Sequence, residues 1–356
     1  MPPSPPPQGT SVRLMVAMAV SLFATLWLAG WSHAATLQYE KHVSDAGLGR
    51  GRSFVHSRVV TSRPRAFATL QLNGWGGVYT TKTGEQVTVY SSNAYPIDPS
   101  ANQAIADFVA GLVHGTEISK VTIYMAPPQE VESLCQSDEA DGCYYPDSGQ
   151  LISIGQDSQY STVEEVLTHE YGHHIATNRL NDPWPAVEWG TKRWATVENV
   201  CRKTQVGLAF PGDEGDHYRQ NPGESFAESY LHLNEVRKGE PESRWFYDPM
   251  FVPGKAALDA IEQDVLQPWN SYSVYTWRGR FARRNQVGMA TLKTPLDGMF
   301  QLQLKGPRGS KIRIYGTNTK QVSPTVAHAL ICGQRSVLTS VTGGGAGAFT
   351  AKALVP

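Results

Sequence analysis

The spacing of apolar residues predicts alternating strands and helices through the middle of this chain. Short runs that alternate or are mostly apolar, as β-strands require, occur at residues 86–90, 121–125 and 151–155. Apolar residues recur at helical spacing in stretches that begin near residues 99, 163, 222 and 253. Together these elements predict an α+β domain over residues 86–268.

The pattern changes from about Ser271 to the end of the chain. Short runs of alternating apolar and polar residues follow one another at residues 300–304, 311–315, 328–332 and 348–355. Turn-forming residues such as Pro307-Arg308-Gly309 separate these runs. The alternation predicts a small all-β sandwich domain over residues 271–356.

The N-terminal segment has the pattern of a secretory signal. The apolar run Leu14–Trp31 follows a single basic residue and ends in small residues, which predicts a signal peptide over residues 1–34, cleaved after Ala34. The alternative is an uncleaved membrane anchor, because a run of this length just spans a bilayer. With cleavage, we expect a secreted protein without stable membrane insertion. Residues 35–85 then form an N-terminal extension, like a propeptide arm, with weak strand signals near residues 67–72.

The charge balance disfavours nucleic acid as a partner. The chain has 31 basic and 32 acidic residues, a formal net charge of −1. A near-neutral chain lacks the basic surface that nucleic acid binding requires. The local basic run from Arg278 to Arg284 is expected to be a solvated strand or turn.

The four cysteines suggest disulfide bonds in an exported protein. Cys135 and Cys143 flank a short polar loop, which a bond between them would close. Cys201 and Cys332 would then join the two predicted domains. All three pairings of four cysteines remain open, and none of the cysteines has the C-x-x-C spacing of a zinc site.

The stretch His169-Glu170-Tyr171-Gly172-His173 is an H-E-x-x-H pattern on the helix expected from residue 163. Histidines four residues apart stand on one face of a helix, so both imidazoles can reach one zinc ion. Glu170 is placed to take a proton from the zinc-bound water. Ser161 and Glu164 are expected to form a capping box at the start of this helix. The competing interpretation, a solvated helix with two incidental histidines, is disfavoured by the apolar face of the helix.

The third metal ligand is expected on the helix that begins at Pro222, with Asn221 as its cap. Glu224 and Glu228 are four residues apart on one face, where like charges repel unless a cation lies between them. We expect Glu224 to bind zinc and Glu228 to accept a hydrogen bond from the distal N–H of a ligand histidine. Two alternatives stay open: Glu224 only caps its helix, or Glu228 is the ligand.

The two motifs together resemble those of the gluzincin metallopeptidases. HEYGHH followed by ESFAESY is most similar to the anthrax lethal factor-like and Pro-Pro endopeptidase group, over roughly residues 151–233. The resemblance implies a zincin-like catalytic domain with Glu170 as general base. It also implies that His169, His173 and Glu224 are the zinc ligands.

The resemblance extends to two further features. The family places a tyrosine about seven residues before the glutamate ligand, where it hydrogen-bonds the oxyanion. Here that position is His217 and the next residue is Tyr218, so Tyr218 is the first candidate for this donor and His217 the second. From residue 295 onward, the chain resembles the pre-peptidase C-terminal domains of secreted bacterial peptidases.

The sequence as a whole predicts a secreted zinc endopeptidase that acts on proteins or peptides. One alternative is a zinc hydrolase of a non-protein substrate; another is an extracellular binding protein with a structural zinc site. A structural site takes a fourth protein ligand, and His174 would point off the shared helix face. Trp184, Trp189 and Trp194 are expected to pack in the core, with cleft lining as the alternative. No sequence feature indicates the oligomeric state or the cleavage preference.

Overall fold

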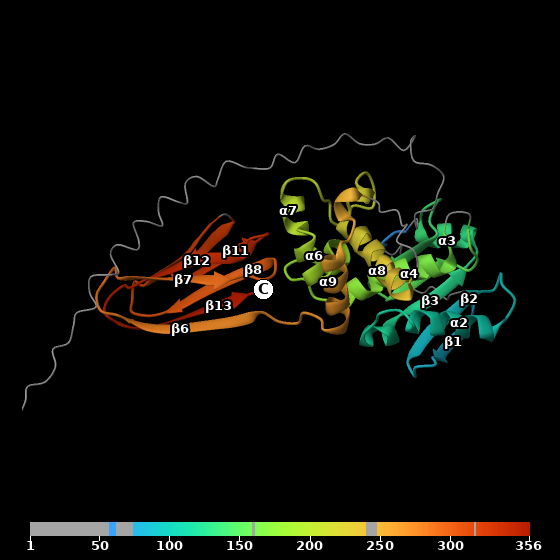
Figure 1. The fold of residues 1–356 in the computed structure, drawn as a ribbon, viewed down its shortest axis with the longest axis horizontal. Helices are drawn as coiled ribbons and strands as arrows, with labels where there is room; N and C mark the ends of the chain where they lie inside the picture. Colours follow the sequence, from blue (N-terminus) through green and yellow to red (C-terminus); the bar gives the residue numbers. More distant parts are fainter. Residues whose placement is uncertain (1–56, 62–73, 159–160, 240–247, 317) are drawn as a thin grey trace, which may run out of the picture. The chain divides into compact units, whose positions relative to one another are not determined.

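The computed structural model describes residues 57–61, 74–158, 161–239, 248–316 and 318–356. Helices and strands are mixed up to residue 266, and strands alone follow from residue 273 (Figure 1). The chain is therefore α+β with a β-rich C-terminal region, as predicted. The predicted signal peptide and the weak strand near residues 67–72 lie outside the described residues. Among the helices that the structure describes, none is long and apolar enough to cross a membrane.

A five-stranded mixed sheet supports the first part of the chain, in the order β1-β2-β3-β5-β4. Its strands are β1 (Gly74–Thr80), β2 (Gln86–Ser92), β3 (Thr122–Ala126), β4 (Gly142–Tyr145) and β5 (Gln150–Ile154). The three central strands are parallel, while β1 and β4 pair antiparallel at the two edges.

The sheet starts before residue 86, so the predicted domain boundary was placed too late. β1 pairs with β2 but lies within the segment predicted as an N-terminal extension. Its glycines hid the strand pattern, and two of them are needed for close packing. A Cβ on Gly74 would lie 2.4 Å from the carbonyl oxygen of Ser91, and one on Gly76 would lie 2.2 Å from that of Val89.

Four helices match the predicted ones, and shorter helices fill the stretches between them. The helices are α2 (Pro99–Ala110), η3 (Thr116–Lys120), α3 (Pro128–Cys135), α4 (Val163–Thr177), α5 (Ala186–Trp189), α6 (Lys192–Val197), α7 (Val200–Gln205), η4 (Tyr218–Gln220), α8 (Pro222–Lys238), η5 (Pro249–Phe251) and α9 (Lys255–Leu266). Asp98 and Asn221 cap α2 and α8 with their side chains.

The capping box of α4 lies one residue later than predicted. Thr162 and Glu165 form it, not Ser161 and Glu164. Thr162 directly precedes the first helical residue, so its hydroxyl can accept the Glu165 N–H at 3.2 Å. The N–H of Ser161 instead donates to the hydroxyl of Ser158 in the preceding loop, at 2.9 Å.

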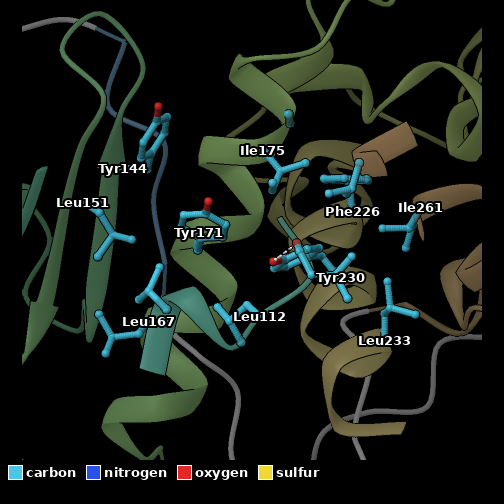
Figure 2. Packing of buried hydrophobic residues seen from close by; sticks show 14 of the residues in the cluster. Leu112, Tyr144, Leu151, Leu167, Tyr171, Ile175, Phe226, Tyr230, Leu233 and Ile261 are labelled. Carbon is cyan, nitrogen blue, oxygen red and sulfur yellow. Dashed lines mark hydrogen bonds between the residues drawn. The ribbon is translucent and has the colours of Figure 1, made fainter. Parts of the chain in front are cut away.

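Helix α4 lies between the sheet and α8 in the main core. Figure 2 shows its residues Leu167, Tyr171 and Ile175 between Leu151 of β5 and Tyr230 of α8. Gly172 allows α4 and α8 to touch, because a Cβ there would lie 2.9 Å from Cα of Ala227. This close crossing sets how far the side chains of α8 stand from those of α4.

The C-terminal strands form two sheets that share one core, as the alternation predicted. The strands are β6 (Ser273–Phe281), β7 (Val287–Lys293), β8 (Gly298–Lys305), β9 (Lys311–Tyr315), β10 (Thr319–Ser323), β11 (Val326–Ile331), β12 (Ser336–Thr342) and β13 (Gly347–Val355). One sheet has the order β10-β11-β8-β13-β6 and the other β7-β12-β9. Phe300 and Leu302 of the first sheet pack with Ile312, Ile314 and Val341 of the second.

Two disulfides are present, and they select one of the three possible pairings. Cys135 at the end of α3 is bonded to Cys143 in β4. Cys201 in α7 is bonded to Cys332, which follows β11. The second bond therefore joins the helical region to the C-terminal strands.

Candidate metal centre

Helix α4 carries the H-E-x-x-H residues into the protein interior. His169, Glu170 and His173 each have 0% of their surface exposed. The two imidazole rings lie 5.1 Å apart, centroid to centroid. The spacing of the motif therefore places both rings on one face of the helix, as predicted.

Helix α8 brings Glu224 to both histidines. One carboxylate oxygen, Oε2, lies 3.2 Å from Nε2 of His169, and the other, Oε1, lies 3.4 Å from Nε2 of His173. The three side chains offer ligand atoms that all lie within 4.8 Å of one another. Glu224 does not cap its own helix: the side chain of Asn221 accepts the Gly223 N–H at 3.0 Å.

The distances and the unmet hydrogen bonds of this cluster both fit a zinc ion. Ligand atoms about 2.0–2.1 Å from a tetrahedral zinc stand about 3.3 Å from one another. Here the three ligand atoms lie within 4.8 Å of one another, and each histidine Nε2 lies 3.2 or 3.4 Å from one oxygen of the Glu224 carboxylate. Neither ring nitrogen of His173 makes a hydrogen bond of ordinary geometry within the described residues, although both are buried. A buried imidazole without partners is costly, and a bond from Nε2 to a metal would compensate.

The charges of the cluster also suit a cation. Burial alone lowers the pKa of His169, but hydrogen bonds to Glu224 and Glu228 outweigh burial and raise that pKa to about 10. Burial likewise disfavours the Glu224 carboxylate, yet the two histidines hold its pKa below the ordinary value. Burial lowers the pKa of His173. Glu224 is therefore ionised at neutral pH, which is the form that binds a metal.

Glu228 lies behind His169, one helical turn from Glu224. Its Oε2 is 3.2 Å from Nδ1 of His169. When a metal displaces the proton of Nε2, the proton on Nδ1 stays donated to this carboxylate and the lone pair of Nε2 is directed at the cluster. Glu224 faces the Nε2 atoms of both histidines, so the geometry favours Glu224 over Glu228 as the ligand.

Tyr218, and not His217, reaches the cluster. The hydroxyl of Tyr218 donates to Oε2 of Glu224 at 2.9 Å. His217 is bonded through Nδ1 to Asp213 at 2.8 Å and stacks on Phe210 with ring centroids 3.8 Å apart. The short helix η4, which begins at Tyr218, turns these neighbours in different directions.

Glu170 lies beside the cluster as a buried carboxyl group. Neither of its oxygens makes a hydrogen bond of ordinary geometry within the described residues. Burial raises its pKa to about 8, while the neighbouring His169 opposes this rise. Gly142 of β4 leaves room for the group, because a Cβ there would lie 2.9 Å from Oε1 of Glu170. A carboxyl whose pKa lies near neutrality can both accept and return a proton.

His174 and the tryptophans lie outside the cluster. His174 has Nδ1 3.0 Å from the hydroxyl of Tyr144 and Nε2 2.9 Å from the carbonyl oxygen of Glu117, so it is not available as a fourth ligand. Trp194 is fully buried in the main core, which confirms the packing interpretation for this residue. Trp184 and Trp189 stack on each other with centroids 4.7 Å apart.

Three residues near the cluster had no sequence signal. The backbone N–H of Ser57 donates to the hydroxyl of Tyr218 at 3.3 Å. Glu214 accepts from the backbone N–H of Val59 at 3.3 Å and from Nδ2 of Asn221 at 3.0 Å. These contacts join parts of the chain that are 161 and 155 residues apart, which no local pattern reveals.

No protein-family model, curated protein or solved structure matches this chain.

Proposed function

We propose that this protein is a zinc-dependent endopeptidase in which His169, His173 and Glu224 bind the metal. The observation that supports this most strongly is the buried carboxyl of Glu170 beside a complete set of three ligands. A catalytic zinc site has three protein ligands and an open position, whereas a structural site takes four and needs no base. The hydrogen bonds that occupy both ring nitrogens of His174 support the catalytic alternative.

A peptide is the substrate class that the surroundings of the site favour. β4 is an edge strand of the sheet, and its Gly142 lies against the carboxylate of Glu170. A strand at the edge of a sheet can bind an extended peptide through backbone hydrogen bonds. A peptide paired with β4 would pass directly beside the proposed base.

Each residue of the site has a separate role in the proposed reaction. Zinc, when bound, lowers the pKa of a water in its open position to about 7 and polarises the scissile carbonyl. Glu170 accepts the proton of the attacking water and delivers it to the leaving amine. The hydroxyl of Tyr218 donates to the carbonyl oxygen as negative charge develops on it. Glu228 holds the ring of His169 in position.

We also propose that the protein acts outside the cell. The two disulfides fit an oxidising compartment, as the predicted signal peptide requires.

Metal analysis combined with digestion of an unstructured protein such as casein tests the proposed function. We expect about one zinc per chain, digestion that stops when a chelator removes the metal, and recovery when zinc is restored. Glu170→Gln is the matched variant, because it keeps the shape of the side chain and removes the base. We expect this variant to keep its zinc and lose digestion. A zinc-loaded protein that left a library of peptides uncut would contradict the proposal and favour a non-protein substrate.

A further inference from the structure

A short N-terminal segment lies against the outer edge of β4. Residues 57–60 run parallel to this strand, with Val59 opposite Tyr144. The N–H of Val60 donates to the carbonyl oxygen of Tyr144 at 2.9 Å. The N–H of Tyr144 donates to the carbonyl oxygen of Arg58 at 3.0 Å. The segment is the blue stretch beside Tyr144 in Figure 2. The N–H and the carbonyl oxygen of Tyr144, which an extended peptide on β4 would use, are therefore already paired.

The same segment reaches the candidate metal centre. The N–H of Ser57 donates at 3.3 Å to the hydroxyl of Tyr218, which itself donates to the metal ligand Glu224. The N–H of Val59 donates to a carboxylate oxygen of Glu214 at 3.3 Å. Ser57, Val59 and Val60 are only 7%, 6% and 8% exposed, so these three residues are buried.

The hydroxyl of Ser57 is a buried polar group on the residue whose N–H reaches Tyr218. It is buried and has no hydrogen bond of ordinary geometry within the described residues, as is also true of the Glu170 carboxylate. A polar side chain is thus placed among the groups that the proposed reaction uses, and not in a purely apolar strand contact.

We propose that residues Ser57–Val60 are an inhibitory segment, bound in the place of a peptide substrate, and that this segment keeps the activity of the intact chain low. The proposal rests on the proposed function, because it assigns the substrate site on β4 to this segment. Its backbone uses the edge of β4 and the hydroxyl of Tyr218, which a substrate would need. A tethered occupant has an effective concentration of about millimolar, so a free peptide at micromolar concentration competes poorly.

The test weakens the segment without touching the catalytic residues. Val60→Pro removes the N–H that donates to Tyr144. Thr61→Pro is the matched control, because Thr61 is exposed and its N–H has no backbone hydrogen bond within the described residues. Val60→Ala is a milder variant that keeps the N–H and removes part of the packing against the cluster containing Tyr124 and Val131.

Two rates are measured on zinc-loaded full-length protein: capture of the zinc by a chromogenic chelator, and digestion of casein. Loss of one hydrogen bond should raise the fraction of molecules in which residues 57–60 have left β4 about fivefold. Both rates should rise by the same factor. We expect this rise in Val60→Pro, a smaller rise in Val60→Ala, and wild-type rates in Thr61→Pro. Thermal unfolding of each variant shows whether the fold is retained, and Val60→Ala replaces Val60→Pro if proline prevents folding.

The outcomes separate the two proposals. Faster zinc capture and faster digestion in the Val60 variants support both. If the Val60 variants lose zinc to the chelator faster but no variant digests casein, the peptidase function is overturned. The faster zinc capture would still support the proposal that residues 57–60 cover the metal site. Unchanged capture and digestion in the folded Val60 variants would overturn the inhibitory role of the segment.

Discussion

Gly172→Ala tests whether the contact between α4 and α8 sets the geometry of the metal site. The added Cβ would lie 2.9 Å from Cα of Ala227, whereas ordinary contact begins at 3.4 Å, so the helices must separate by about 3.4 − 2.9 = 0.5 Å. Overpacking of this kind lowers the free energy of unfolding by about 1–3 kcal/mol. The better helix propensity of alanine offsets about 1 kcal/mol of this loss. We therefore expect the protein to fold with a loss of about 0–2 kcal/mol in unfolding free energy.

The effect on zinc should be larger than the effect on folding. Metal–ligand distances tolerate only about 0.2 Å, and Glu224 lies on α8 while both histidines lie on α4. We expect zinc affinity to fall on the order of 10–100-fold, as when a ligand loses its orienting partner.

The assay is competition for zinc with a chromogenic chelator, with thermal unfolding recorded in parallel. Gly77→Ala is the control, because a Cβ at Gly77 meets nothing within 4 Å. Wild-type zinc affinity in a folded Gly172→Ala protein would refute the argument that this crossing positions the ligands.

Three further predictions concern single side chains. Measured on zinc-loaded protein, Tyr218→Phe should lower kcat on the order of 10²-fold, whereas His217→Phe should change kcat less than about twofold. Equal losses would contradict the assignment of Tyr218 as donor. Glu228→Gln should weaken zinc binding on the order of 10–100-fold, and an unchanged affinity in chelator competition would show that this carboxylate does not orient the first histidine. Burial raises the pKa of Glu117, but Arg179, 2.7 Å away, and the N–H of Gly115, 2.6 Å away, together outweigh burial and hold the pKa below its ordinary 4.5. Because the folded pKa is the lower one, the pair stabilises the fold above about pH 4.5 and this contribution is lost as the pH falls further. Glu117→Gln should therefore cost about 3–5 kcal/mol in urea unfolding at pH 7 and less below pH 4, and a constant difference would contradict the linkage.

The parts of the site that the sequence could predict are those set by spacing within one helix. His169 and His173 share a face because they are four residues apart, and the same holds for Glu224 and Glu228. The helix start at Asn221 was predicted for a similar local reason. The cap of α4 was misplaced by one residue because Ser161 and Thr162 carry the same chemistry, and only the backbone shows which one precedes the helix.

The parts that could not be predicted depend on contacts between distant segments. Gly172 was expected only as a variable position of the motif, yet it is the point where α4 meets α8. β1 was missed because its glycines, which close packing requires, erase the apolar alternation. The contact of Ser57 with Tyr218 joins residues 161 positions apart, and nothing near Ser57 in the sequence indicates it.

The central claim is tested most directly by the digestion rate of Glu170→Gln, with zinc content measured on the same samples. The comparison is made in the intact chain and in Val60→Pro, so that the inhibitory segment does not conceal the result. We predict that Glu170→Gln keeps its zinc and digests casein on the order of 10²–10⁴-fold more slowly than the matching protein with Glu170. A zinc-loaded Glu170→Gln protein that digests at the unchanged rate would contradict the account.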